Sequence, residues 1–244
     1  MTWIVVGASS GLGRALSERL AKEGKSLLLA SSDHRDLLPL ASDLQIRFGT
    51  EVHCYSHDAE DHGGFAQGLF NSLRGTEPID GILFPIGYVH KTDCGDLAPS
   101  GIERLVNINF LSVVSVVSVL LHRMLENKKG VIVGFGSIAG IRGRGINVVY
   151  SASKRALQSY FEGLRHRYER YGLLIQFYIL GYLDTNLAFG QKLLLPKADP
   201  ARVAESVVSN FEKRGGTRYL PRFWRPIGII VRTLPWLIFK RMNF

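Results

Sequence analysis

The sequence predicts a single α/β domain with a doubly wound parallel sheet flanked by helices. Short strands rich in apolar residues alternate with helical segments along the 244 residues, and no repeat, low-complexity stretch or Pro/Gly-rich linker interrupts them. Residues 1–244 are therefore taken as one domain, long enough for a full core. We expect strands at 2–6, 26–30, 51–56, 80–85, 130–135 and 173–180, and helices at 12–23, 35–48, 62–74, about 100–125, 151–171 and about 200–214.

The first strand leads directly into a glycine-rich turn that opens the first helix, Gly7-Ala8-Ser9-Ser10-Gly11-Leu12-Gly13. Glycine allows a tight turn and a close approach of the backbone to a ligand. A helix N-terminus also offers free N–H groups and the positive end of its dipole to a pyrophosphate. The glycines alone fit an ordinary strand-to-helix turn equally well, but their position after a strand that begins at residue 2 favours a nucleotide site.

A serine and a Tyr-x-x-x-Lys pair form the second informative pattern. Ser137 closes the strand segment 130–137, at the sheet edge where ligands of parallel sheets gather. Tyr150 follows thirteen residues later, and Lys154 lies one helical turn beyond it on the same face. A nearby ammonium favours the phenolate and lowers the pKa of a tyrosine from its usual value of about 10. A serine hydroxyl can hold a substrate oxygen as charge develops on it.

A Tyr-x-x-x-Lys pair occurs by chance in many helices, so the prediction depends on its combination with Ser137. Together with the glycine turn, it predicts hydride transfer to or from a carbonyl. These residues also resemble the short-chain dehydrogenase/reductase family, and the resemblance covers nearly the whole chain. It rests on the glycine turn and on three further segments, Val-Asn-Ile-Asn-Phe at 106–110, Gly-Ser-Ile-Ala-Gly at 136–140 and Tyr-Ser-Ala-Ser-Lys at 150–154.

The resemblance implies a Rossmann-type domain and a role for each site residue. Tyr150 would be the general acid/base, Lys154 would tune its pKa and clamp the cofactor ribose, and Ser137 would hold the substrate oxygen. Asn109 would anchor a water in a proton relay, and Asp58 would meet the adenine. The implied cofactor-binding set is Gly7, Ser9, Ser10, Gly11, Leu12, Gly13, Ser31, Ser32, Arg35, Asp58, Gly87, Tyr150, Lys154, Gly181, Leu183 and Thr185.

Three segments depart from the family pattern. Phe84-Pro85-Ile86-Gly87 replaces Asn-Asn-Ala-Gly, Leu180-Gly181 replaces Pro-Gly after the sixth strand, and Gly134 replaces a strand asparagine. None of these changes removes a catalytic group. They predict that the walls of the cofactor pocket are atypical.

The residues after the second strand predict a preference for NADP(H) over NAD(H). NAD-preferring relatives place an acidic residue at the strand end to bind the ribose 2′-OH, and that position holds Ser31. Nothing there repels a 2′-phosphate, which Ser31, Ser32, His34 or Arg35 could bind. Asp33 is the counter-argument, because a shifted loop could bring its carboxylate to the ribose.

Bulk properties point to a cytosolic enzyme. The uncharged run Leu105–Leu121 has the minimum length of a membrane span, but it contains two asparagines and three serines and is interpreted as a buried helix. Met1 leads straight into the first strand, so no secretory signal is expected. The two cysteines and seven histidines lack metal-ligand spacing, and the cysteines are expected to be reduced.

The C-terminal tail is basic and apolar. The net charge is +9, and residues 213–244 contain eight Lys/Arg and no acidic residue. Arg232 and Pro235 interrupt the apolar stretch, which is too short to span a bilayer. A basic segment with Trp and Phe suits the surface of an anionic membrane or a lipid substrate. The alternative is a tail that packs on its own domain or on a second subunit. Nucleic acid is not expected to bind, because no recognised binding module is present.

The segment 218–244 supports a narrower resemblance, to reductases of a polyprenyl-phosphate-linked 2-keto-pentose that serve cell-envelope synthesis. Segments 84–87, 142–144 and 163–167 share it. It implies that Arg142, Arg144 and the loop 186–196 surround the substrate. The sequence thus predicts an NADP-dependent ketone reductase in the cytoplasm, at the inner face of the membrane, with a homodimer or homotetramer expected from the family. The alternatives are reduction of a long-chain keto-lipid or soluble carbonyl, and a non-catalytic NADP-binding interaction protein.

Overall fold

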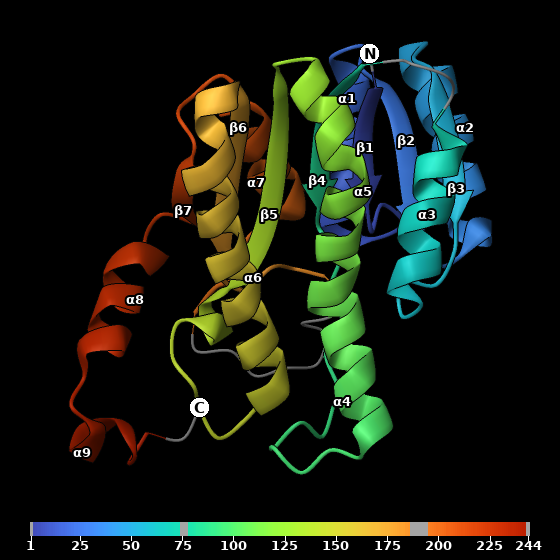
Figure 1. Ribbon diagram of the computed structural model, residues 1–244. Helices are drawn as coiled ribbons and strands as arrows, with labels where there is room; N and C mark the ends of the chain where they lie inside the picture. The colour runs from blue at the N-terminus through green and yellow to red at the C-terminus, as the bar shows by residue number, and fades with distance from the viewer. Residues whose placement is uncertain (1, 74–77, 186–194, 243–244) are drawn as a thin grey trace.

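A seven-stranded sheet forms the centre of the domain in the computed structural model, which describes residues 2–73, 78–185 and 195–242 (Figure 1). All its strand pairs are parallel, in the order β3-β2-β1-β4-β5-β6-β7. The predicted α/β class is confirmed. The strands are β1 (Thr2–Val6), β2 (Ser26–Ser31), β3 (Val52–Ser56), β4 (Ile79–Phe84), β5 (Gly130–Ser137), β6 (Leu173–Leu180) and β7 (Gly216–Leu220).

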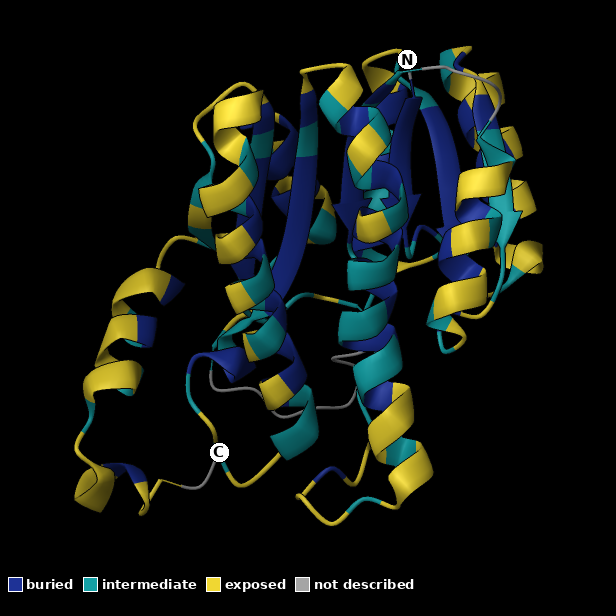
Figure 2. Ribbon diagram, viewed as in Figure 1, coloured by how far each residue is buried: buried dark blue, intermediate teal, exposed yellow. Residues whose placement is uncertain are grey.

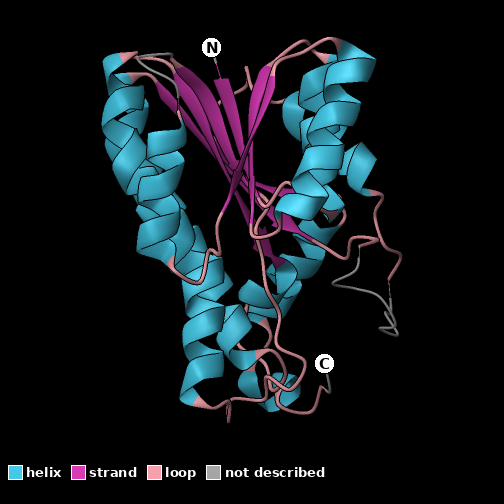
Figure 3. Cartoon of the chain, turned by 90° about the vertical axis from the view of Figure 1, so that its right-hand side faces the viewer, coloured by secondary structure: helices cyan, strands magenta, loops and turns pink. Residues whose placement is uncertain are grey.

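Helices cover both faces of the sheet, as the turned view shows (Figure 3). They are α1 (Gly11–Lys22), α2 (His34–Phe48), α3 (His62–Ser72), α4 (Pro99–Val106), α5 (Ser112–Glu126), α6 (Val148–Tyr168), α7 (Pro200–Val208), α8 (Trp224–Thr233) and α9 (Trp236–Phe239). Because successive side chains of a strand point to opposite faces, β1 contributes to two apolar layers. Val5 packs with α1, α2 and α7, whereas Ile4 and Val6 pack with α3, α5 and α6. The buried residues lie along the sheet and the inner helix faces (Figure 2).

The helix expected at about 100–125 consists of α4 and α5, joined by the π-helical turn Asn107–Leu111. A single π-helical turn often marks a functional site, and this one carries Asn109. The stretch Pro99–Glu126 is long and apolar enough to cross a membrane. However, Val113, Val117 and Leu120 are fully buried in the core, so it is a core helix of the domain.

The C-terminal third departs most from the sequence-based expectations. The strand β7 was not expected, because Gly216 and Arg218 interrupt any apolar run and this edge strand pairs only with β6. The helix expected at about 200–214 ends at Val208. The tail forms two short helices, α8 and α9, which meet at Pro235.

Candidate active site

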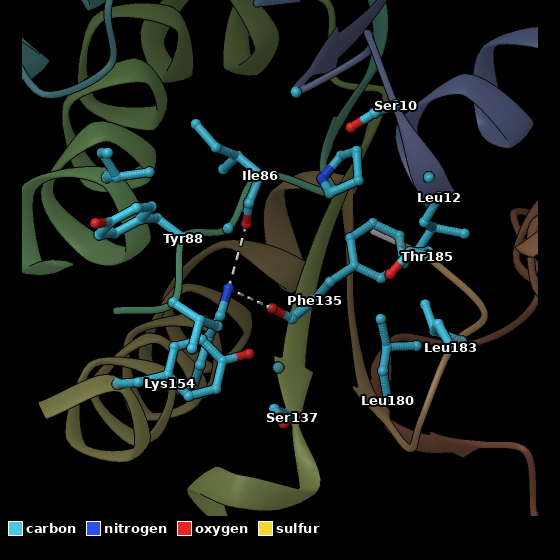
Figure 4. Close-up of a pocket in the computed structure, with 18 of the residues that line it drawn as sticks. Ser10, Leu12, Ile86, Tyr88, Phe135, Ser137, Lys154, Leu180, Leu183 and Thr185 are labelled. Carbon is cyan, nitrogen blue, oxygen red and sulfur yellow. Dashed lines mark hydrogen bonds between the residues drawn. The ribbon is translucent and has the colours of Figure 1, made fainter. Parts of the chain in front are cut away.

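A cavity of about 420 Å³ opens at the carboxyl edge of the sheet, where the loops after β1, β4, β5 and β6 converge (Figure 4). This is the edge at which parallel α/β sheets bind their ligands. The cavity brings together most of the residues predicted from the sequence, namely Gly7, Ser9, Ser10, Gly11, Leu12, Ser31, Ser32, Asp58, Gly87, Ser137, Tyr150, Lys154, Gly181, Leu183 and Thr185. Gly13, Arg35 and Asn109 lie outside its lining.

The glycine turn is shaped by close packing. Gly7 has a φ of +92°, and a Cβ on it would lie 2.9 Å from the backbone of Ile86. A Cβ on Gly13 would overlap the carbonyl oxygen of Gly7, so Gly13 lets α1 pack onto the end of β1. Ser10 is the N-cap residue of α1 but makes no side-chain capping bond. The first turn of α1 thus keeps N–H groups for an anionic ligand, which fits the pyrophosphate of a dinucleotide.

The end of β2 meets the glycine turn through two hydroxyls. Ser31 Oγ donates a hydrogen bond of 2.8 Å to Ser9 Oγ. Asp33 instead caps α2, because its Oδ1 accepts a bond of 2.9 Å from the Arg35 backbone N–H. The Arg35 guanidinium also binds Asp33, with 2.7 Å between Nη2 and Oδ2, and this hydrogen bonding lowers the pKa of Asp33 to about 2. Asp33 and Arg35 are therefore paired with each other outside the cavity lining.

Lys154 is the buried cation of the site. Its Nζ donates hydrogen bonds to the backbone carbonyl oxygens of Ile86, at 3.2 Å, and Phe135, at 3.4 Å (Figure 4). The residue is only 5% exposed. Because burial disfavours the ammonium, it lowers the pKa of Lys154 from 10.5 to about 8. Nζ lies 5.9 Å from the centre of the Tyr150 ring.

Burial raises the pKa of Tyr150 above 10, although a hydrogen bond with Ser137 and the charge of Arg144 act in the opposite direction. The expectation that Lys154 would lower this pKa is not met in the structure. Burial also lowers the pKa of Lys154, so its charged form is less stable, and its Nζ donates hydrogen bonds to two backbone carbonyl oxygens. The phenol therefore stays protonated at neutral pH, which is the form that can donate a proton.

Ser137 stands at the end of β5, and its Oγ accepts a 3.1 Å bond from the Ala139 N–H. Asn109 is fully buried and clamps the segment after β4: its Oδ1 accepts from the Tyr88 N–H at 2.8 Å, and its Nδ2 donates to the Tyr88 carbonyl at 2.7 Å. Both atoms of its amide are thus engaged by the wall of the site. Its expected part in a proton relay stays a prediction.

Of the three departures from the family pattern, the glycine at position 134 has a packing explanation. The segment 84–87 supplies the Ile86 carbonyl that receives Lys154. A Cβ on Gly134 would lie within 2.7 Å of the Phe161 ring, so the glycine makes room for that aromatic. Gly181 is in turn pressed against the indole of Trp224.

Of the two arginines expected around the substrate, only Arg144 lines the cavity. Its Nε is buried without a hydrogen-bond partner. Arg142 instead binds the C-terminal helices, which corrects its expected place at the substrate. The loop 186–196 lies mostly outside the described residues.

Asp93 was missed by the sequence analysis. Its buried carboxylate accepts hydrogen bonds from the backbone N–H groups of Val149, at 3.1 Å, and Tyr150, at 2.9 Å. It thereby caps the first turn of α6, whose own N-cap residue, Asn147, makes no side-chain capping bond. A lone aspartate so far from the helix in sequence gives no local signal of this role.

Comparison with known proteins identifies the class. The family model described as short chain dehydrogenase matches residues 1–192, and the chain belongs to this family. It is 31% identical over 187 residues to the oxidoreductase YmfI of Bacillus subtilis, covering 76% of each protein. It is 26% identical over 244 residues to the human very-long-chain 3-oxoacyl-CoA reductase, covering 97% of this chain and 77% of that protein. The protein is therefore an oxidoreductase of the short-chain family, whose fold binds a nicotinamide cofactor.

Solved structures share the fold. A short-chain dehydrogenase from Sphingobium yanoikuyae in complex with NADPH has a TM-score of 0.83 at 21% identity, over 99% of this chain and 96% of that chain. A 3-oxoacyl-[acyl-carrier protein] reductase from Brucella melitensis has a TM-score of 0.78 at 18% identity, over 90% and 89%. Among the described residues, no group of three or more His, Cys, Asp or Glu side chains could hold a metal ion.

We predict that Asp93→Asn lowers kcat by about tenfold, because the loss of a charged cap worth roughly 1–2 kcal/mol loosens the turn that carries Tyr150. Steady-state kinetics with any ketone that the enzyme reduces would measure this. NADPH affinity should change little. Asp96→Asn, at an exposed position in the same loop, is the matched control. Equal kcat values for the two variants would show that Asp93 does not position Tyr150.

The lowered pKa of Lys154 predicts a stability change with pH. Between about pH 8 and 10.5 the unfolded chain holds the proton that the folded protein has lost, so the contribution of Lys154 to stability rises with pH. From pH 8 to pH 9 the free energy of unfolding of the wild type should rise by about 1 kcal/mol relative to Lys154→Met. Urea unfolding of both proteins at the two pH values tests this. Parallel changes in the two proteins would mean that the folded-state pKa is not lowered.

Proposed function

We propose that this protein is an NADPH-dependent ketone reductase in which Tyr150 donates the proton to the substrate oxygen. One observation carries the proposal: Ser137, Tyr150 and Lys154 line the same cavity as the glycine turn at the start of α1. A nicotinamide bound there would supply the hydride. The intact set argues against the alternative of a non-catalytic NADP-binding protein.

The electrostatics favour reduction. Ser137 holds the carbonyl oxygen beside the Tyr150 hydroxyl, and the raised pKa of Tyr150 keeps its proton in place until negative charge develops on that oxygen. Lys154 balances the phenolate that forms when the proton leaves. Its lowered pKa also makes it able to pass a proton on near pH 8.

The preference for NADP(H) is supported by the surroundings of β2. Ser31 and Ser32 line the cavity, and neither can repel a 2′-phosphate. The nearby acid, Asp33, is occupied by the cap of α2 and by Arg35. The same pairing leaves the phosphate to serine hydroxyls and backbone N–H groups rather than to Arg35.

The substrate that we favour is a polyprenyl-phosphate-linked 2-keto-pentose, as in decaprenylphosphoryl-2-keto-erythro-pentose reductase, and thus a role in cell-envelope synthesis. Arg144 supports an anionic substrate, because the residue lines the cavity, its Nε has no hydrogen-bond partner among the described residues, and its charge acts on Tyr150. A long-chain keto-lipid is the second candidate, favoured by the relatives named very-long-chain 3-oxoacyl-CoA reductase. We place the enzyme in the cytoplasm as a homodimer or homotetramer.

We predict that Tyr150→Phe abolishes turnover, with a loss of at least about a hundredfold, because no other donor replaces the phenol proton. Isothermal titration should show that NADPH still binds, since the ring and its packing remain. Retention of near wild-type kcat would remove Tyr150 from the proposed role.

Ser31→Asp should shift the cofactor preference toward NADH. The new carboxylate would repel a 2′-phosphate and accept a hydrogen bond from a 2′-OH, which changes the ratio of kcat/KM for NADPH over NADH by about tenfold or more. Ser31→Asn, which has the shape of the aspartate without its charge, is the matched control and should not produce this shift toward NADH. A wild type that uses both cofactors equally well contradicts the predicted preference.

Arg144→Gln should raise KM for a phosphorylated ketone by about tenfold or more, because a charge-assisted hydrogen bond is lost. KM for an unphosphorylated ketone should change little. The comparison of the two substrates, measured with the same variant, separates anion recognition from a general defect. Equal losses for both substrates would contradict the anion site.

A further inference from the structure

The two C-terminal helices form an arm beside the main body. This arm, α8 and α9 with their flanking residues 222–242, lies beyond β7 on the side of the strand carboxyl ends (Figure 1). Trp224, Gly228 and Phe239 are its buried contacts. A Cβ on Gly228 would lie 2.8 Å from Ile141 and 3.0 Å from Tyr219, so the arm packs closely along this inner side.

The outer side of the arm is exposed (Figure 2), and several of its exposed side chains are large and apolar. The exposed fractions are 54% for Ile229, 59% for Ile230, 65% for Trp236, 68% for Leu237 and 53% for Ile238. No described part of the chain covers these side chains. A contiguous group of large apolar side chains in water marks an interaction surface.

Basic residues are interspersed with these apolar residues along the arm, and the segment from Lys213 to Phe244 contains no acidic residue. The exposed cations of the arm are Arg222, Arg225, Arg232, Lys240 and Arg241. A second copy of the chain docked symmetrically on this face would bring like charges together, which is unfavourable. Anionic phospholipids supply the opposite charge and an apolar interior, and a Trp such as Trp236 suits the boundary between them.

The arm is attached to the loops that form the cavity. Arg142 donates hydrogen bonds to the carbonyl oxygens of Val231, at 2.9 Å, and Leu234, at 2.5 Å, and its guanidinium lies 4.0 Å from the centre of the Phe239 ring. Arg144, two residues further on, lines the cavity.

The second attachment is aromatic. Tyr182 lines the cavity and packs edge-to-face on Trp224, with 5.2 Å between the ring centres. A surface bound to the arm is therefore held next to the cavity walls formed by the loops after β5 and β6.

We propose that the arm docks the enzyme on an anionic phospholipid bilayer. The apolar residues of α8 and α9 enter the interface, the flanking cations meet lipid phosphates, and the cavity is held close to the membrane. The docking proposal depends only on the exposed apolar and basic side chains of the arm. Its use, delivery of a lipid-linked ketone from the bilayer to the cavity, rests on the proposed function.

The test is co-sedimentation of the full-length protein with vesicles of phosphatidylcholine, with and without phosphatidylglycerol. The wild type should bind the anionic vesicles, and added salt should release it. The double variant Trp236→Ser/Leu237→Ser should lower the partition coefficient by at least about tenfold, because it removes two exposed apolar side chains. The matched control is Leu38→Ser/Ile46→Ser, which removes two exposed apolar side chains, 50% and 84% accessible, on α2.

Two further measurements make the result decisive, thermal melting and size-exclusion chromatography, which gives the oligomeric state. Thermal melting checks that the variants fold. If the double variant binds anionic vesicles as well as the wild type does, the proposal is overturned. It is also overturned if the wild type does not bind them. A wild-type dimer that the double variant converts to a monomer would overturn it too, because the surface would then be a subunit interface.

Turnover of a water-soluble ketone separates this proposal from the proposed function. If the soluble ketone is reduced but anionic vesicles are not bound, docking fails and the reductase stands. If vesicles are bound but no ketone is reduced, docking stands and the proposed function fails.

Discussion

The burial of the Lys154 ammonium between two backbone carbonyl oxygens is the constraint on which the rest of the site depends. A cation in the interior is tolerated only when it is hydrogen-bonded. Its partners, the carbonyls of Ile86 and Phe135, come from the ends of neighbouring strands, β4 and β5. One side chain from α6 thus ties the helix that carries Tyr150 to the sheet edge. The same burial lowers the pKa of Lys154 to about 8, so the packing that fixes this side chain also sets its acidity.

Two buried polar groups fix the surroundings of this cation. Asn109, in the π-helical turn, holds Tyr88 just beyond Ile86, and Asp93 in the same loop caps α6 at Tyr150. The loop after β4 therefore connects the helical turn before α5 to the start of α6. Each of these groups has its hydrogen bonds satisfied by backbone, which makes the arrangement rigid before any ligand arrives.

The sequence predicted the sheet, its flanking helices and most of the cavity lining, because those features follow from local patterns. Strands such as β1 are apolar runs, and Gly7 and Tyr150 belong to short motifs. Asp93 could not be predicted, because it acts on a helix far away in sequence. The place of Arg142 also depends on tertiary packing with the tail. β7 was missed because a short edge strand needs little hydrophobic periodicity. The raised pKa of Tyr150 reflects burial, which no motif encodes.

The catalytic residues and the attachment of the arm at Tyr182 line the same cavity. Reduction of a ketone in this cavity is the function on which both proposals converge. The most direct test is to incubate the protein with NADPH that carries deuterium at both C4 positions and three classes of ketone: a polyprenyl-phosphate 2-keto-pentose, a long-chain keto-lipid and small soluble ketones. The account predicts deuterium on the carbinol carbon of at least one product, detected by mass spectrometry, with the polyprenyl substrate turned over fastest. NADPH that binds to the protein but transfers no deuterium to any of these ketones would contradict it.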